Sequence, residues 1–267
     1  MSFTIAITGK GGVGKTTVAG LLVSRLIGRG CSPVLAVDAD PNTCLDEVLG
    51  VKVSSTVGGV REEARQAAAK GLAAGVSRQQ LLEMRIAESL VEADEFDLIA
   101  MGRPEGPGCY CYANNVLKDV ILKLSRNYPY VVIDNEAGLE NLSRRIVQAV
   151  NLLVMVTDPS RKGRQTVGRL HQLAREMDVR YERLAIIVNR LPDGSLPRGA
   201  DELSARTGAE FIIGLPEDAE LLDASQRGES LLHLPATNAV ARKMEELLTA
   251  VCPVPAARKT LVPPGRS

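Results

Sequence analysis

Tryptophan is absent from this 267-residue chain, aromatic residues make up only 3% of it, and neither sign of charge is in excess. Its 32 basic side chains balance 32 acidic ones, whereas nucleic-acid binding usually requires a basic excess, so we expect no nucleic-acid partner. The few aromatic rings also disfavour a stacking platform for bases. No apolar run is long enough to span a bilayer and no signal-peptide pattern is present, so we expect a cytoplasmic protein that does not bind a membrane.

Hydrophobic residues make up 45% of the chain, which is enough for one large core. Short apolar runs alternate with longer helical stretches, a rhythm typical of right-handed βαβ crossovers. We therefore predict an α/β fold: a mainly parallel sheet of about seven strands with helices on both faces, in one domain over residues 1–252. The expected strands are Phe3–Thr8, Pro33–Asp38, Asp97–Met101, Tyr130–Asp134, Leu152–Thr157, Leu184–Asn189 and Glu210–Ile213.

Helical patterns fill most of the gaps between these strands. The expected helices are Thr16–Ile27, Asn115–Arg126, Arg161–Met177, Glu217–Gln226 and Asn238–Val251. Residues 51–95 interrupt the rhythm, and we predict an inserted helical hairpin there, with surface helices at Val60–Lys70 and Arg78–Ala93. The proline-rich residues 253–267 are predicted to be a disordered tail.

A glycine-rich loop follows the first expected strand and opens the first expected helix. The pattern G-x-x-x-x-G-K-[ST] is a phosphate-binding loop when it lies between a strand and a helix. Glycines allow the backbone N–H groups to surround phosphate oxygens, Lys15 would reach the β- and γ-phosphates, and the Thr16 hydroxyl would ligate Mg²⁺. The predicted nucleotide-binding residues here are Gly9, Lys10, Gly11, Gly12, Val13, Gly14, Lys15, Thr16 and Thr17.

Acidic residues end two further strands, at the sheet edge where ligands of parallel α/β proteins bind. Asp134 closes an apolar strand in the manner of a Walker-B acid and would hold Mg²⁺ through a water. Asp38 and Asp40 end the second strand. One of them can orient or deprotonate the attacking water and the other can lie near the metal. Helix caps or solvated loop charges are the alternative interpretation.

A lysine at position 10 is expected to point away from the nucleotide bound to its own loop. It could contact a phosphate only if a partner subunit brought one near it. Three motifs of this chain resemble those of the deviant Walker-A ATPases of the SIMIBI class: Gly-Lys-Gly-Gly-Val-Gly-Lys-Thr-Thr, Asp-Ala-Asp-Pro and Asp-Asn-Glu-Ala-Gly. The resemblance covers nearly the whole chain. This resemblance implies an ATPase that binds ATP or ADP with Mg²⁺ and acts as a homodimer. It implies that Lys10 is catalytic in trans, together with Lys15, that Asp40 activates water, and that Asp38 associates with Mg²⁺.

The same class suggests where the adenine base would lie. Asn189 and Arg190 resemble its adenine-reading position, and an amide offers both a donor and an acceptor to the base edge. Leu215, Pro216 and Glu217 form the next loop along that edge and could flank the base. A helix start is an equally good interpretation of Glu217.

Cys109 and Cys111 form a C-x-C pair in a Gly- and Tyr-containing segment. Two thiols cannot close a structural zinc site, which takes four ligands, but a two-fold dimer axis would bring four sulfurs together. Such a site suits Zn²⁺, Ni²⁺ or an iron–sulfur cluster; incidental cysteines are the alternative. The other three cysteines, Cys31, Cys44 and Cys252, are expected to be small packing residues.

Together with Asp134–Glu140, the C-x-C pair resembles the CooC family of carbon monoxide dehydrogenase maturation ATPases, including relatives that serve acetyl-CoA synthase. That resemblance implies a nickel-insertion metallochaperone whose partner is the client nickel enzyme. Two alternatives remain. One is an iron–sulfur ATPase resembling the nitrogenase iron protein, although no cysteine follows Asp134 until Cys252. The other is a spatial-organiser ATPase of the plasmid-partition and septum-site type.

Overall fold

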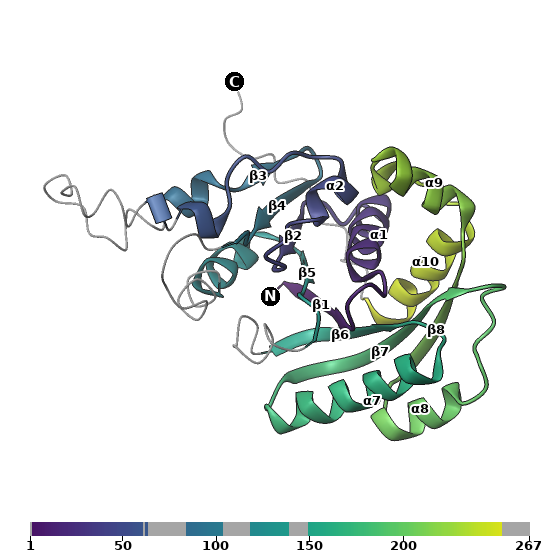
Figure 1. The fold of residues 1–267 in the computed structure, drawn as a ribbon. Coiled ribbons are helices and arrows are strands. Elements are labelled where there is room, and N and C mark those ends of the chain that lie inside the picture. Colours follow the sequence, from purple (N-terminus) through teal and green to yellow (C-terminus); the bar gives the residue numbers. More distant parts are fainter. Residues whose placement is uncertain (1, 61, 64–83, 104–117, 139–148, 253–267) are drawn as a thin grey trace, which may run out of the picture.

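The computed structural model describes residues 2–60, 62–63, 84–103, 118–138 and 149–252. These residues build an eight-stranded sheet of order β3-β4-β2-β5-β1-β6-β7-β8 (Figure 1). Every neighbouring pair is parallel except β3 and β4. The strands are β1 (Phe3–Gly9), β2 (Val34–Asp38), β3 (Val91–Glu92), β4 (Phe96–Ala100), β5 (Tyr130–Asp134), β6 (Ala149–Thr157), β7 (Arg180–Leu191) and β8 (Phe211–Pro216).

The central strands are apolar on both faces because helices cover both sides of the sheet. Ile5 and Ile7 of β1 pack into one cluster, whereas Ala6 between them packs into another. The first face is covered by α1 (Lys15–Gly28), α2 (Leu45–Leu49), α9 (Ala219–Arg227), the 3-10 turn η2 (Leu231–His233) and α10 (Ala239–Val251). The other face carries α7 (Arg161–Glu176) and α8 (Ala200–Thr207) (Figure 1). The predicted α/β fold with helices on both faces is confirmed.

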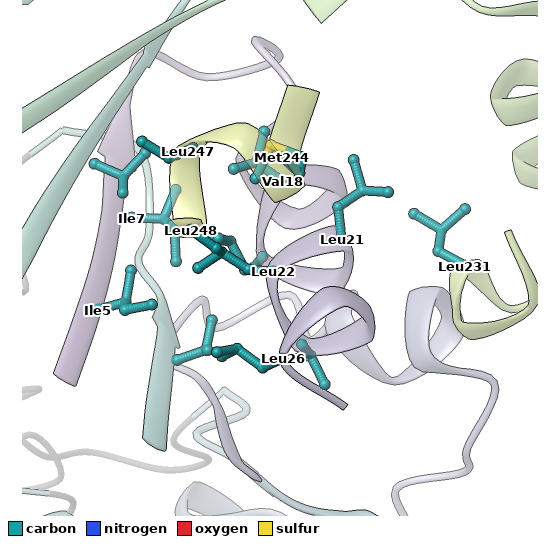
Figure 2. Packing of buried hydrophobic residues seen from close by; sticks show 14 of the residues in the cluster. Ile5, Ile7, Val18, Leu21, Leu22, Leu26, Leu231, Met244, Leu247 and Leu248 are labelled. Carbon is teal, nitrogen blue, oxygen red and sulfur yellow. The ribbon is translucent and has the colours of Figure 1, made fainter. Parts of the chain in front are cut away.

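The helix that follows the phosphate loop is fixed by a large apolar contact with α10. Val18 and Leu22 of α1 and Met244 and Leu248 of α10 are all fully buried, and Figure 2 shows them gathered between the two helices. Full burial of one such side chain stabilises the fold by about 1.5–3 kcal/mol. The α1–α10 contact therefore fixes the direction in which α1 leaves the loop.

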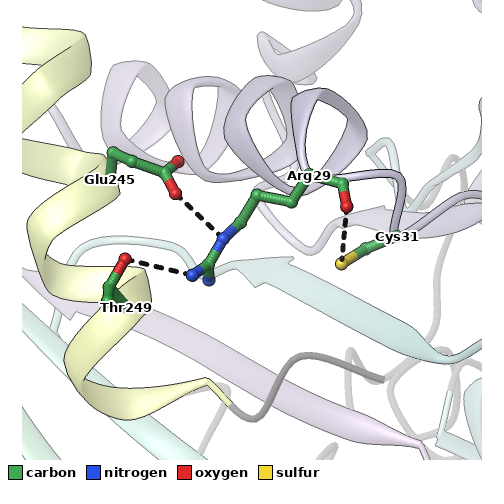
Figure 3. Close-up of polar contacts among 4 residues, drawn as sticks. All are labelled: Arg29, Cys31, Glu245 and Thr249. Carbon is green, nitrogen blue, oxygen red and sulfur yellow. Dashed lines mark hydrogen bonds and ion pairs between the residues drawn. The ribbon is translucent and has the colours of Figure 1, made fainter. Parts of the chain in front are cut away.

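Polar contacts join the same two helices at the far end of α1 (Figure 3). The Arg29 Nε lies 2.9 Å from Glu245 Oε1, and Arg29 Nη2 donates to Thr249 Oγ1 at 3.0 Å.

Cys31 follows this helix end and is buried, as is Cys252 after α10, so the expectation that both are packing residues is confirmed. The same expectation for Cys44 is wrong, because its side chain is exposed at the N-terminus of α2.

Three details differ from the predicted element pattern. The extra strand, β3, spans two residues and runs antiparallel at the sheet edge, within a segment predicted to be helical. Helices α2 and α8 were not predicted. The Asn189 position lies inside β7, which continues to Leu191 past a register shift, rather than at its end.

The predicted helical insert is only partly described. Residues 57–60 and 84–88 are helical, as expected for parts of a helical hairpin. Val57, Val60 and Ile86 are buried against β2, β4 and β5, so this segment completes the core and is not only a surface addition. The remainder of the insert and the predicted tail, 253–267, lie outside the described residues. No helix among the described residues has the length and apolarity needed to cross a bilayer.

Candidate functional site

The glycine-rich loop lies where the order of the strands in the sheet reverses. Helix α1 connects β1 to β2 in one direction along the sheet, whereas α7 connects β6 to β7 in the other. The adjacent carboxyl ends of β1 and β6 therefore form a topological switch point, where α/β proteins bind ligands. Gly12 and Gly14 have φ angles of 78° and 94°, in the region that favours glycine. A side chain on Gly9 would collide with the Val156 carbonyl of β6. The sequence therefore needs glycine at these positions to turn from β1 into α1.

Contacts with two other parts of the chain, and one contact across the loop itself, hold this loop in place. Gly138 N donates to Gly9 O at 3.0 Å, which joins the loop to the segment after β5. At the other end, the Val13 side chain is buried in the core and Asn189 Nδ2 of β7 donates to Val13 O at 2.9 Å. Between them, Lys15 Nζ donates to Lys10 O at 3.3 Å across the loop. The protein's own backbone and side chains therefore fix the path of the loop.

Helix α1 begins at this loop with its N-terminus free for an anion. Gly14 is its N-cap and has no side chain to accept from the first-turn N–H groups, and no acidic residue lies in the first turn. Unsatisfied N–H groups and the helix dipole together favour a negative group at such an end. Lys15 is 8% exposed, so its ammonium group adds a partly buried positive charge beside them.

Asp38 and Asp134 lie side by side at the ends of β2 and β5, where they are paired in register. Asp38 accepts from three backbone N–H groups, those of Asp40 at 3.0 Å, Cys44 at 2.8 Å and Leu45 at 2.9 Å. Burial nevertheless raises the pKa of Asp38 to about 6. Burial, with the nearby Asp38 carboxyl, also raises the pKa of Asp134 to about 7, against the opposing effects of the Thr16 hydrogen bond and Lys15.

These residues fit a magnesium ion. Asp134 Oδ1 is buried without a hydrogen-bond partner among the described residues, although a buried carboxylate oxygen normally has one. Thr16 contacts the same carboxyl group and carries the hydroxyl that the loop motif assigns to the metal. Oxygen donors of this kind are the ligands that Mg²⁺ prefers. Thr16, Asp134 and the adjacent Asp38 would therefore hold the ion, directly or through water.

Asp40 is half-buried on the loop after β2. Its Oδ1 accepts from both the backbone N–H and the side-chain amide of Asn42, each at 2.9 Å. These contacts order the loop in the manner of an Asx turn. The alternative interpretation of Asp40 as a loop-ordering residue thus has direct support, and its action on water stays a prediction.

A pocket of about 630 Å³ opens beside the N-terminus of α1. Residues predicted from the sequence form one side of it: Gly14, Thr17, Asn189, Arg190, Pro216 and Glu217. Leu215, also predicted to flank the base, is 1% exposed, packs in the core and is not among the pocket residues. The other side was not predicted, because it comes from helices α2 and α9 and turn η2, which carry no motif; among these residues are Glu47, Val48, Leu221, Leu222 and Leu231.

Lys10 is exposed on the outer surface of the loop, where a second molecule could reach it. Nearby, burial opposes the ionisation of Asp158, but hydrogen bonds from Ser160 and the charges of Lys10 and Arg190 outweigh it and lower the Asp158 pKa.

Cys109 and Cys111 lie outside the described residues. Within the described part of the chain, no three His, Cys, Asp or Glu side chains are grouped as metal ligands.

The glycine-rich loop, the helix start without a side-chain cap and the paired aspartates define a P-loop nucleotide-binding protein. The sequence profile of the AAA domain family matches residues 2–186. An uncharacterized ATP-binding protein of Methanocaldococcus jannaschii is 40% identical over 91% of this chain and 96% of its own length. The carbon monoxide dehydrogenase accessory protein CooC of Rhodospirillum rubrum is 30% identical over 86% of this chain and 89% of its own.

Solved structures agree on the fold. The septum site-determining protein MinD of Pyrococcus horikoshii, complexed with Mg-ADP, superposes with a TM-score of 0.69 at 19% identity, over 97% of this chain and 100% of its own. A ParA family ATPase from Chlorobium tepidum gives the same TM-score at 20% identity, over 93% and 99%. The chain therefore belongs to the AAA domain family of P-loop ATPases, as a SIMIBI-class member close to CooC.

Proposed function

We propose that this protein is an ATP-hydrolysing, homodimeric metallochaperone that inserts nickel into carbon monoxide dehydrogenase or acetyl-CoA synthase. The observation that carries the proposal is its 30% identity to a protein named as a carbon monoxide dehydrogenase accessory protein, over 86% of the chain. The C-x-C pair Cys109 and Cys111 gives that similarity a chemical basis, since thiolates suit Ni²⁺ and Zn²⁺.

In this proposal, the phosphates of ATP lie on the Gly9–Thr17 loop and the base lies in the 630 Å³ pocket beside it. Mg²⁺, when bound, would neutralise charge on the phosphates. Asp40 orients the attacking water. Lys10 is exposed and reaches the phosphates of the partner subunit, where it offsets the charge that develops during hydrolysis. Loss of the γ-phosphate then loosens the dimer.

The metal cargo is held where two copies of the chain meet. Cys109 and Cys111 from both subunits supply four thiolates, the number that a closed tetrahedral site requires. ATP can control this site only if ATP and metal favour the same dimeric state. By linkage, the metal must then promote dimerisation to the same extent that dimerisation promotes metal binding.

The test is metal content per dimer after anaerobic loading with nickel, with zinc, or with iron plus sulfide. The double variant Cys109→Ala/Cys111→Ala should lose stoichiometric metal and keep ATP binding. Cys44→Ser is the matched control, because it removes an exposed thiol but keeps the backbone N–H that binds Asp38. Unchanged metal content in the double variant would exclude the chaperone function, and a cluster formed only with iron and sulfide would favour the iron–sulfur ATPase.

A spatial-organiser ATPase is the second candidate, favoured by the likeness to MinD and ParA structures. Membrane binding by such a protein needs an amphipathic helix with a free apolar face. The last described helix, α10, instead buries its apolar residues in the core, including Val240, Met244 and Leu247. ATP-dependent co-sedimentation with liposomes or DNA, without any metal requirement, would support this function against the first.

A further inference from the structure

We propose that Asn189 is a positioning residue that fixes the phosphate loop from the base pocket, so that base and phosphate recognition share one side chain. The proposal rests on the ATP-binding role of the site and is independent of the metal cargo. The sequence alone assigned Asn189 to the base only. Its contacts in the structure assign it to the loop as well.

Both ends of the Asn189 amide are engaged. Nδ2 donates to Val13 O at 2.9 Å, and Oδ1 accepts from Arg190 N at 2.9 Å. The second contact fixes the amide orientation, so that the N–H groups, not the oxygen, face Val13. Arg190 has a φ of 61°, and β7 shifts its register between Val188 and Leu191. An irregular strand thus directs Asn189 across to the loop, 176 residues away in sequence.

The contact matters because of what it does to the next N–H group. A trans peptide is planar, so the carbonyl of Val13 and the N–H of Gly14 point in opposite directions. With Val13 O held toward β7, Gly14 N–H is directed away from β7, on the side where the loop can surround a phosphate. The Val13 side chain is buried in the core and fixes the same peptide from its other end. Asn189 therefore orients a phosphate-binding donor without touching phosphate.

The glycine at position 14 fits this arrangement. A Cβ there would lie 2.5 Å from Asn189 Nδ2, which is too close for any real contact. Its φ of 94° is also unfavourable for other residues. The Asn189 amide fills the space between loop and strand. A side chain at position 14 would therefore push the amide away from Val13.

The same amide lines the base pocket together with Arg190, Pro216 and Glu217. An amide has two N–H groups and two acceptor sites on oxygen, and the loop and Arg190 use one of each. One donor and one acceptor are left for a base. A base in the pocket that bonds this amide would therefore also stabilise the orientation of the Val13–Gly14 peptide.

The test is calorimetric titration of the full chain with Mg-ATP and with Mg-bound inorganic triphosphate, which has no base. Asn189→Ala should weaken both ligands, by about 3- to 10-fold for the triphosphate, the effect of one lost hydrogen bond. Asn189→Asp keeps the acceptor for Arg190 but turns a carboxylate oxygen toward Val13 O, and should weaken triphosphate further. Asn127→Ala is the matched control, because Asn127 is exposed on the 3-10 turn Ser125–Asn127 and does not line the pocket, so the affinities for both ligands should be unchanged.

Thermal unfolding of each variant separates a local effect from a loss of fold. Weaker ATP binding by Asn189→Ala with unchanged triphosphate affinity would overturn the proposal and leave Asn189 as a base contact only. Wild-type protein that binds ATP but not triphosphate would also overturn it, since the loop would then not bind phosphate independently of the base. Absence of ATP binding itself would instead contradict the function of the whole site.

Discussion

Asp134 has a buried oxygen that lacks a hydrogen-bond partner among the described residues, which destabilises the protein when no cation is bound. Such an atom costs about 1–3 kcal/mol. Asp134→Asn removes the charge and should raise the unfolding free energy of the metal-free protein by about 1 kcal/mol at pH 8. The same change should lower Mg-dependent ATP hydrolysis by about 10- to 100-fold. Urea unfolding and phosphate release measure the two effects, and a variant that loses both stability and activity would contradict this role.

Where a motif fixes the spacing, sequence patterns indicate which residues lie close together, whereas the roles of those residues stay predictions. The structure places Lys15, Thr16 and the aspartates at positions 38 and 134 close together, because they end neighbouring strands or begin the helix that follows. The tie between Asn189 and Val13 could not be predicted, since it depends on a register shift in β7. Cys44 was wrongly predicted to be a packing residue, because its small side chain gives no sign of its exposed place at a helix N-terminus.

At the scale of elements, α10 packs against α1, the helix that follows the glycine-rich loop (Figure 2). Leu248 is fully buried between α10 and α1, and Leu→Ala changes at such positions cost about 2–5 kcal/mol. Leu248→Ala should therefore lower the unfolding free energy by about 3 kcal/mol. Leu222→Ala on α9 is the matched control, because Leu222 is 59% exposed and its loss should cost under about 0.5 kcal/mol. Equal effects of the two changes on urea unfolding would contradict this packing.

Helix α7 carries a buried histidine that makes stability depend on pH. His171 lies 2.9 Å from the Tyr181 hydroxyl, and burial, with a smaller effect from Arg175, lowers its pKa. The unfolded chain then binds a proton that folded His171 resists, so stability should fall as pH drops below the ordinary value of about 6.5. Unfolding free energies from pH 8 to pH 5 should show a shallower decline in His171→Gln than in wild type. Parallel curves would refute the assignment.

The elements that bury much apolar surface could be predicted from the sequence, whereas short elements that bury little could not. The strands buried on both faces were predicted because their apolar runs are continuous, as in Tyr130–Asp134, where the bounds agree fully. Strand β3 was missed because two residues at a sheet edge produce no pattern. Helix α2 spans five residues, too few for a helical period to be visible, yet it borders the 630 Å³ pocket. Short elements are thus defined by tertiary contacts.

At the scale of the whole molecule, the glycine-rich loop lies at the carboxyl end of the central strand β1, and its Lys10 is exposed. Nothing in the net charge, which is zero, opposes self-association. If ATP and metal favour the same dimer, nickel should lower the concentration of ATP needed for dimerisation, and ATP should tighten nickel binding by the same factor. Paired titrations measure both factors, and an effect in only one direction would be inconsistent with linkage.

The most direct test of the two-subunit switch is sedimentation velocity of wild type and Lys10→Ala with Mg²⁺ and a non-hydrolysable ATP analogue. Lys10 is exposed and its side chain has no described hydrogen bond, so its removal should leave the fold and nucleotide affinity intact. Wild type should sediment at twice the 28.5 kDa of one chain and Lys10→Ala as the single chain. A nucleotide-bound Lys10→Ala protein that still dimerises and hydrolyses ATP at the wild-type rate would contradict the account.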